Sequence, residues 1–316
     1  MDDQTGNESS PYADTIYQQP WWLDAVAPGR WGEATVVRDG QTIARMPYFI
    51  KRKLGLTALT MPPLTQTLGP WIQRSDGKYA NRLAVEQGLM EELISQLPTF
   101  DLFVQNFSTE TTDWLPFYWA GFQQTTLYTY RLEDLTNVDA IWDGMLHSVR
   151  QNIRKAEKLV TVRTDLGIEP LLELIAQVFV RQDMKSPYSP DLVRRLIAAC
   201  ALNNCGQTFF AEDTRGRIHA ALYIVWDDKT AYCVLSGADT TLRNSHAGSL
   251  LSWTAIQFAA KVTKAFDFTG SMIKSLEKHK RSYGGKQVGY FSVRKMKSRM
   301  AVLSAARDAW NVIRQK

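Results

Sequence analysis

The sequence predicts an α/β protein with a mixed sheet, in which largely antiparallel strands combine with helices in two domains. With 316 residues, the chain is long for one hydrophobic core and comfortable for two. Both halves follow one plan: a hairpin with its turn at Gly40 or Gly216, an intervening segment, an amphipathic helix, and a buried strand at 101–106 or 265–268. A meander followed by a helix and a further strand indicates a mixed sheet rather than a doubly wound parallel one.

Turn residues and apolar spacing predict the elements of the first half. A tryptophan pair at 21–22 lies in a short buried helix that Pro28-Gly29 ends. The turn Asp39-Gly40 joins two strands that read as a hairpin. We expect the hairpin strands over 33–38 and 42–50, an irregular loop over 61–70, a helix over 83–97, and strands over 101–106 and 125–132.

The second half repeats the pattern with more helix. Ser189 is a good N-cap, and Pro190 at the first helical position has no N–H to leave unpaired. We expect a charged helix over 138–158, a strand over 159–163, helices over 169–182 and from 189, strands over 207–212, 218–226 and 230–236, a helix over 248–262, a strand over 265–268, a basic helix, a strand over 288–293 and a closing helix over 300–312.

Composition is that of a globular protein. Hydrophobic residues make up 45% and charged residues 22%, and no run approaches the roughly 18 apolar residues of a membrane span. No apolar segment follows the acidic opening of the chain, so we expect no signal peptide. The cysteines Cys200, Cys205 and Cys233 form no CxxC pair, which favours reduced thiols in a cytoplasmic protein over a zinc ribbon or a disulfide scaffold.

The net charge of +5 is unevenly distributed. Residues 271–316 carry twelve basic and two acidic residues, a net charge of +10. A second basic cluster contains Arg150, Arg154 and Lys155, and continues to Lys158 and Arg163. Each cluster is either a solvent-exposed helix face or part of a site for an anionic ligand such as RNA or a phosphate.

The segment 236–249 is the most informative for binding. A strand ends, a polar loop turns, and a helix begins, so free backbone N–H groups there favour phosphate or carboxylate. Arg243, Ser245, His246 and Gly248 are the candidate binding residues. The loop is similar to the Arg/Gln-x-x-Gly-x-Gly/Ala loop by which GNAT acyltransferases hold the pyrophosphate of coenzyme A, with His246 in place of the first glycine. The alternative is an ordinary loop-to-helix junction capped by Ser245.

Four segments in order resemble the Fem-type peptidoglycan-bridge aminoacyltransferases and related acetyltransferases of the GNAT superfamily. These families typically carry a strand ending Asp-Phe-Gly-Gly-Ser and then Phe-Lys-x-x-Phe-Gly. The corresponding segments here are 19–23, 148–158, 266–271 and 278–285. The resemblance implies tandem GNAT-like domains and transfer of an activated acyl group to an amine. It also implies that acyl-CoA or aminoacyl-tRNA is the donor and a peptidoglycan precursor or sugar nucleotide the acceptor.

The resemblance assigns roles to further residues. Lys280 matches the family lysine and would hold phosphate or carboxylate, or stabilise developing negative charge. Asp267 is a candidate base or a structural carboxylate, and Tyr283 a candidate proton donor or a packing aromatic. Arg150, Arg154 and Lys155 match the family's basic helix and would bind substrate, unless that helix is only solvent-exposed. The HExxH, GxSxG and Walker patterns do not occur, so we expect no metal and no permanently bound cofactor.

These observations predict a cytoplasmic acyltransferase. It would transfer an acetyl or aminoacyl group to an amine on a cell-envelope precursor or sugar. The alternative is a non-catalytic module that binds RNA or a nucleotide-linked precursor. The expected organisation is a disordered segment 1–13, an N-terminal GNAT-like domain 14–135, a C-terminal acyltransferase domain 136–295 and a basic helix 296–316.

Overall fold

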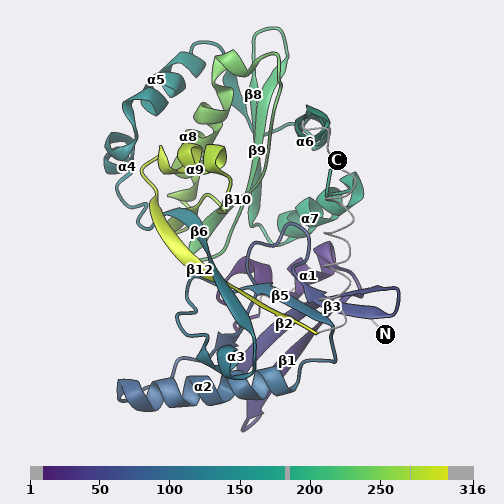
Figure 1. The fold of residues 1–316 in the computed structure, drawn as a ribbon. Helices are drawn as coiled ribbons and strands as arrows, with labels where there is room; N and C mark the ends of the chain where they lie inside the picture. Colours follow the sequence, from purple (N-terminus) through teal and green to yellow (C-terminus); the bar gives the residue numbers. More distant parts are fainter. Residues whose placement is uncertain (1–9, 182–185, 271, 298–316) are drawn as a thin grey trace, which may run out of the picture. The chain divides into compact units, whose positions relative to one another are not determined.

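The computed structural model describes residues 10–181, 186–270 and 272–297. Two compact units share these residues (Figure 1). The N-terminal unit comprises 10–126 and 290–297, and the C-terminal unit comprises 127–289. Residues 1–9 of the expected disordered segment, Ser271 and nearly all of the expected C-terminal helix lie outside the described residues.

The N-terminal unit contains a mixed sheet with one long helix against it. Its strand order is β1-β2-β3-β5-β12, and β4 pairs with β2. The β3–β5 pair is parallel, while the β1–β2, β2–β3 and β5–β12 pairs are antiparallel. Its elements are the 3-10 helix η1 (Ile16–Gln18), α1 (Pro20–Val26), β1 (Trp31–Arg38), β2 (Gln41–Lys53), β3 (Leu56–Thr60), β4 (Trp71–Ile72), α2 (Tyr79–Ser95), β5 (Leu102–Asn106), α3 (Leu115–Trp119) and parts of β6 (Gln123–Leu132) and β12 (Lys286–Met296).

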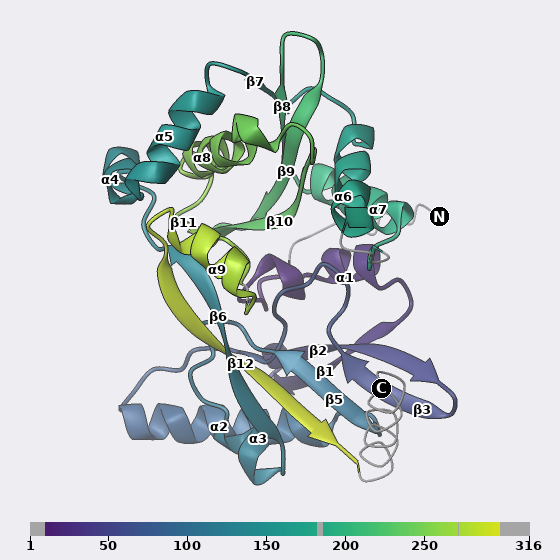
Figure 2. The same cartoon turned by 45° about the horizontal axis from the view of Figure 1, so that its top comes forward.

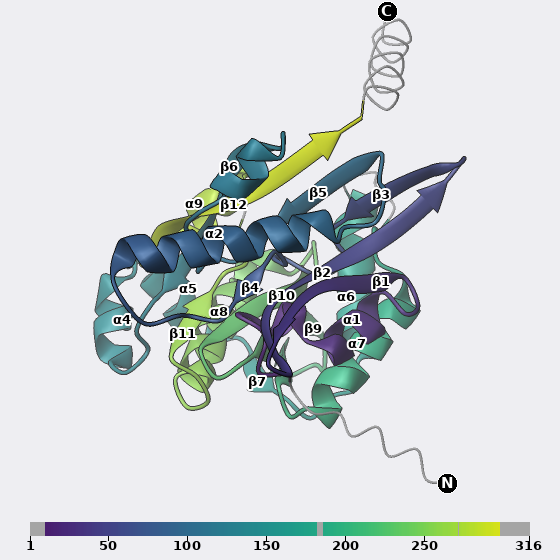
Figure 3. The same cartoon turned by 90° about the horizontal axis from the view of Figure 1, so that it is seen from below.

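Aromatic packing fills this core. Figure 3 shows α2 lying across the strands, and its buried Leu89, Met90 and Leu93 belong to the same hydrophobic cluster. Phe103 of β5 packs edge-on against Phe122, with ring centroids 5.2 Å apart. The predicted hairpin, helix and buried strand therefore meet in one core, because each presents its apolar face to the others.

The C-terminal unit has the strand order β6-β11-β10-β9-β8-β7, with helices on both faces. In Figures 1 and 2, α8 lies on one face of the β8–β10 meander and α6 on the other. Its further elements are α4 (Val138–Gly144), α5 (His147–Ala156), β7 (Thr161–Arg163), α6 (Glu169–Arg181), α7 (Pro190–Leu202), β8 (Gly206–Glu212), β9 (Ile218–Trp226), β10 (Thr230–Ala238), the 3-10 helix η2 (Arg243–Ser245), α8 (Ala247–Ala259), β11 (Ala265–Asp267) and α9 (Lys274–Arg281).

The helices on both faces of the sheet explain why β9 is buried along almost its whole length. Its residues from His219 to Val225 are all buried, because α8 covers one side and α6 the other. The mixed α/β fold predicted from the sequence is confirmed.

Strands β10 and β11 separate after a short parallel ladder. They pair only where residues 230–232 meet 265–267. On its other side, β10 continues to pair with β9 as far as Ala238, with a register shift between Cys233 and Leu235. The later part of β10 therefore has no described strand on the β11 side, which leaves backbone groups available beside the loop that leads into α8.

The charged segment 138–158 differs from the single helix that its spacing predicts. It forms α4 and α5, because Met145 between them adopts extended backbone angles (φ −70°, ψ 149°). Met145 is buried, and its burial anchors the break. The break gives α5 its own direction, with Val149, Ile153 and Ala156 facing the core.

Close packing of α6 on β10 gives a test of this fold. A Cβ atom at Gly237 would lie 2.7 Å from the carbonyl carbon of Leu174 and 2.9 Å from the amide nitrogen of Ile175. Since backbone cannot move aside cheaply, Gly237→Ala should lower the free energy of unfolding by about 1–3 kcal/mol. Gly88→Ala is the control, because space around Gly88 of α2 is open and alanine favours a helix by about 1 kcal/mol. Denaturant titration that shows equal stability for both variants would contradict this packing.

Candidate functional site

A cavity of about 230 Å³ lies in the C-terminal unit where β10 leads into α8. All four residues predicted to bind an anion line it, namely Arg243, Ser245, His246 and Gly248. The other lining residues are His219, Ala238, Ala247, Ser249 and His279. The loop, the meander and α9 therefore contribute to one space.

Asp239 shapes the loop before α8. One oxygen of its carboxylate accepts hydrogen bonds from the amides of Thr241 and Leu242 and from the Thr241 hydroxyl. Donation by the Thr241 side chain is the main reason that the pKa of Asp239 lies below its usual value. This turn directs the chain into the 3-10 helix that carries Arg243.

His246 occupies an unusual backbone position immediately before α8. Its φ of 58° lies in the left-handed region, which few residues with a Cβ adopt. No side chain caps the helix from this position. Burial lowers the pKa of His246, and the positive charge of Lys155 lowers it further, so the imidazole is mainly neutral at pH 7.

The start of α8 offers room for a ligand. Gly248 is exposed, and a Cβ built there would meet no atom within 4 Å. Arg243 is exposed and makes no ion pair with any residue that the structure describes. At the start of α8, the amide of Ala247 donates to the Ser245 hydroxyl and the amide of Ser249 donates to the His246 carbonyl. The Gly248 amide and the Arg243 guanidinium are the donors that remain for a phosphate or pyrophosphate.

The three predicted substrate-binding residues of α5 differ in whether they lie near the loop before α8. It packs against η2 and α8, and Lys155 lies near enough for its charge to act on His246. Arg150 instead pairs with Asp143 (Nη1–Oδ1, 3.3 Å). Arg154 lies over the ring of Trp142, 5.6 Å from its centroid. Of the three predicted substrate-binding residues, the structure therefore brings Lys155 to the loop and holds the two arginines against α4.

Asp267 is buried at the end of β11 and fastens the turn that follows. One carboxylate oxygen accepts hydrogen bonds from the Thr129 hydroxyl (2.5 Å) and the Thr269 amide (2.6 Å). The Thr129 oxygen in turn accepts a hydrogen bond from the amide of Gly270 (2.8 Å). Burial raises the pKa of Asp267, against the opposing effects of these donors and of Arg131 and Lys280.

Lys280 lies on α9, and its side chain contacts the turn that follows β11. Its ammonium group donates a hydrogen bond to the carbonyl of Gly270, near Asp267 and Cys233. Burial lowers the pKa of Lys280 and raises that of Cys233 to about 11. The thiol of Cys233 therefore keeps its proton at neutral pH. Lys278, by contrast, is exposed on another face of α9.

His279 on α9 and Tyr283 just after the end of α9 pack against each other beside Lys280. Tyr283 is fully buried, with its ring against Phe268, and its hydroxyl has no hydrogen bond of normal geometry to any described residue. Burial raises the pKa of Tyr283, while the nearby hydroxyls of Ser249 and Ser252 lower it. His279 packs edge-on against Tyr283, with ring centroids 5.2 Å apart. Desolvation, and then the charge of Lys280, lowers the pKa of His279.

Sequence reasoning missed two histidines of the cavity. His279 received no role in the sequence analysis. Its position on a short helix, one residue before the proposed functional lysine, was the available signal. His219 is buried near the start of β9, and nothing in the sequence separates it from a core residue. Its Nε2 lies 3.1 Å from an Asp213 carboxylate oxygen.

Most of the C-terminal unit matches a known protein family. Residues 144–281 match the family described as acetyltransferase (GNAT) domain. Among curated proteins, no relative was found by sequence. Every residue that lines the cavity lies within 144–281, so the cavity belongs to a segment that is similar to GNAT acetyltransferases, as the sequence resemblance implied.

Similar solved structures confirm the tandem arrangement of the fold. FemX has a TM-score of 0.66 at 14% identity, over 89% of this chain and 92% of its own. A tandem GNAT protein from the clavulanic acid biosynthesis pathway has a TM-score of 0.51 at 8% identity, over 92% and 89%. The L-PGS of Bacillus licheniformis has a TM-score of 0.53 at 12% identity, over 88% and 87%. The predicted tandem GNAT-like fold is thereby confirmed.

None of the described helices combines the length and apolarity required to cross a membrane. Among the same residues, no group of three or more histidine, cysteine or acidic side chains is arranged to hold a metal ion.

The Asp267 cluster predicts a stability effect at Thr129. Thr129→Val removes a donor to the buried carboxylate and leaves the Gly270 amide unpaired, which should cost about 1–3 kcal/mol of unfolding free energy. The deficit should shrink as the pH falls, because losing this donor raises the pKa of Asp267 further and a protonated Asp267 needs it less. Thr125→Val, on the exposed side of β6, should change stability by no more than about 0.5 kcal/mol. A Thr129 variant as stable as the Thr125 variant from pH 5 to 8 would refute this account.

Proposed function

We propose that the chain is an N-acyltransferase that takes an acyl group from acyl-CoA and transfers it to an amine on a cell-envelope precursor or a sugar. The observation that carries the proposal is the cavity at the start of α8. It joins the anion-binding loop of Arg243 and Gly248 to His279, whose neighbours on α9 and beyond are Lys280 and Tyr283. The likeness to FemX and the Fem-type sequence segments support an envelope precursor as acceptor.

Donor binding follows from the loop chemistry. The guanidinium of Arg243 and the Gly248 amide at the start of α8 would hold the pyrophosphate of the donor. Lys155 would add positive charge from α5. A neutral His246 adds no charge, but its ring can exchange a hydrogen bond with a phosphate oxygen.

The reaction needs a proton acceptor, a proton donor and support for an oxyanion. His279 is suited to accept the proton of the attacking amine, because its lowered pKa keeps it neutral at pH 7. Tyr283 keeps its proton and is suited to donate it to the leaving thiolate. Backbone N–H groups of β10 beyond its ladder with β11 would stabilise the oxyanion, and they gain strength from being fixed in advance.

Lys280 and Asp267 support this centre in different ways. Lys280 lies where its positive charge would stabilise a carboxylate, a phosphate or the developing oxyanion. Asp267 is surrounded by protein donors, so we assign it a positioning role: it holds the turn whose Gly270 carbonyl receives the lysine. The nucleophile is the substrate amine itself.

Helix lengths favour acyl-CoA over aminoacyl-tRNA as donor. Fem-type enzymes that use tRNA often carry a long helical arm in the second domain. Between β7 and β8, the described helices are α6 and α7, each of 13 residues, or about 20 Å. Neither is long enough to form such an arm.

A thermal-shift panel tests the donor. Acetyl-CoA and longer acyl-CoAs should raise the melting temperature of the wild type, because a ligand that binds only the folded state stabilises it. Arg243→Ala should weaken acyl-CoA binding roughly tenfold to a hundredfold, the effect of losing one charge-assisted hydrogen bond. Arg215→Ala, in the exposed turn before β9, is the matched control. If the protein instead bound bulk tRNA with steeply salt-dependent affinity and did not respond to acyl-CoA, the result would contradict the enzyme proposal and support an RNA-binding module.

Lys280 separates a catalytic site from a basic surface. With acyl-CoA and a panel of amines (glucosamine, amino-sugar nucleotides, lysine peptides), Lys280→Ala should lower kcat about 10²-fold, as does the loss of one fixed donor. Lys278→Ala should have little effect. Because burial lowers the pKa of Lys280, activity should fall on the basic side below the usual lysine value of about 10.4. Lys280→Arg, which stays charged, should remove that fall. Equal, small reductions of kcat in the Lys278→Ala and Lys280→Ala variants would show that these lysines act only through the overall positive charge of the helix.

A further inference from the structure

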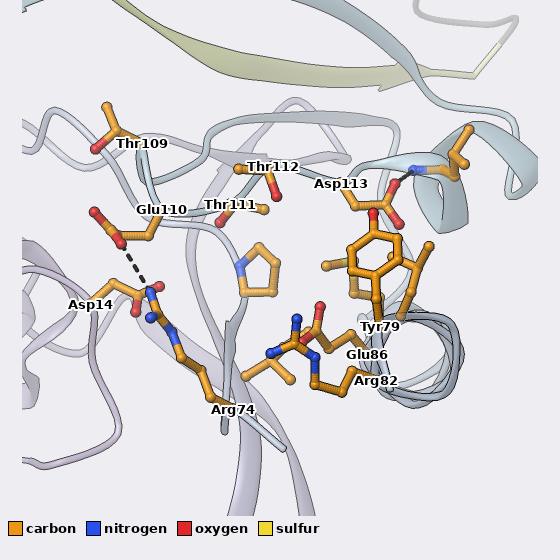
Figure 4. A pocket seen from close by; sticks show the side chains of 15 residues that line it. Asp14, Arg74, Tyr79, Arg82, Glu86, Thr109, Glu110, Thr111, Thr112 and Asp113 are labelled. Carbon is orange, nitrogen blue, oxygen red and sulfur yellow. Dashed lines mark hydrogen bonds and ion pairs between the residues drawn. The ribbon is translucent and has the colours of Figure 1, made fainter. Parts of the chain in front are cut away.

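A cavity of about 580 Å³ lies in the N-terminal unit, outside the site described above. Figure 4 shows it between α2, the strand β4 with the residues after it, and the segment 109–115. This volume is within the range of small-molecule sites. Neither the acyl-transfer proposal nor the sequence motifs account for it.

The cavity has the same topological position in its unit as the candidate site has in the other. In both units a three-stranded meander is followed by a helix, a strand parallel to the last meander strand, and a short helix. Both cavities adjoin the beginning of the first helix (α2 or α8) and the segment after the parallel strand (β5 or β11). The repeat predicted from the sequence thus places a cavity in both units, but the residues that line the two cavities differ completely.

Two charged side chains of this second cavity are unpaired. Arg82 and Glu86 both extend from α2 toward the cavity, and neither forms an ion pair or side-chain hydrogen bond with another described residue (Figure 4). They are four residues apart and share a helix face. The order arginine then glutamate is the weaker one for an i,i+4 pair, so the helix gains little from joining them.

Other charged groups of the lining are already engaged. Arg74 pairs with Glu110 at 3.2 Å, and Asp14, which also lines the cavity, is engaged as well. Asp113 accepts hydrogen bonds from the Leu115 amide and from the Gln87 side chain, each at 2.8 Å. A ligand therefore meets one free cation and one free anion on neighbouring turns of a single helix.

The remaining lining is amphiphilic. Apolar residues form one part of the wall, and hydroxyl groups form another. The apolar set is Pro70, Ile72, Leu83 and Met90, and the hydroxyl set is Tyr79, Thr109, Thr111 and Thr112. Such a lining suits a ligand that carries both an apolar side chain and peptide-like polar groups.

We propose that this cavity binds a small zwitterion of amino-acid to dipeptide size. Its carboxylate would pair with Arg82, its ammonium group with Glu86, and its side chain would lie against the apolar wall. A charged pair in the ligand satisfies both free groups at once, whereas a simple anion or cation leaves one of them unpaired. The proposal is independent of the acyl-transfer chemistry.

Calorimetry on the full chain with one dipeptide and its blocked forms tests the idea. Ala-Leu should bind, and both N-acetyl-Ala-Leu and Ala-Leu-amide should bind at least about tenfold more weakly, since each lacks one charge-assisted contact. In Arg82→Ala, Ala-Leu and its amide should bind equally, while the preference over the acetylated form remains. In Glu86→Gln, Ala-Leu and its acetylated form should bind equally, while the preference over the amide remains.

Arg52→Ala, an exposed position on β2, is the control and should preserve both preferences. Melting curves of each variant verify that it is folded. Absence of Ala-Leu binding to the wild type at about 10 mM would overturn the proposal, because even a weak site of this kind should reach millimolar affinity. Equal affinity of the wild type for Ala-Leu and both blocked forms, or unchanged preferences in both variants, would overturn the proposal as well.

Discussion

The candidate site depends on one buried carboxylate. Asp267 ends the strand β11, and there the chain must turn sharply, with Thr269 in the left-handed region at φ 60°. A turn of that kind needs compensation, which comes from the donors that converge on Asp267 and from the Thr269 hydroxyl bound to the Cys233 carbonyl. This last bond joins the turn to β10 just where the parallel ladder ends. The position of the Gly270 carbonyl, and through it that of Lys280, follows from the same cluster.

The separation of β10 from β11 leaves backbone groups available at the site. The ladder stops after three residue pairs, while the helix α8 begins beyond the end of β10. Backbone donors of the strand and of the helix start are then available together, and side chains need supply only charge and proton transfer. In the proposed reaction, Arg243 would therefore supply charge, His279 a basic nitrogen and Tyr283, which packs against His279, a proton. In such a site, electrostatic pre-organisation comes mainly from the fold.

Sequence patterns predicted the elements that have strong local signals and missed what tertiary contacts decide. The Asp-Gly and Asp-Thr-Arg-Gly turns, the Ser189-Pro190 helix start and the alternation of Asp267 with two phenylalanines all appear where expected. The break at Met145 was missed, although Gly144 directly before it ends α4, because the apolar spacing continues across the break. The burial of Met145 is visible only in the folded structure. Arg150 and Arg154 were grouped with Lys155 on charge alone. Their contacts with Asp143 and Trp142 depend on how α4 folds back on α5, and periodicity carries no information on that. The role of His279 in the cavity likewise required the position of α9.

Comparison of the two units shows how one topology supports two chemistries. In the C-terminal unit, a left-handed His246 precedes α8, its carbonyl accepts a hydrogen bond from the Ser249 amide, and the space around Gly248 is open. In the N-terminal unit, Lys78 precedes α2 in an extended conformation, and its carbonyl accepts hydrogen bonds from the amides of Asn81 and Arg82. Charge recognition there has moved from the backbone to side chains on the next turns, Arg82 and Glu86. A backbone site suits a polyanion whatever the sequence around it, whereas a side-chain pair of opposite sign suits a ligand with both charges. Under the two proposals, divergence of the halves would preserve the cavity and change the ligand, because the topology forms the cavity and the side chains supply the charges.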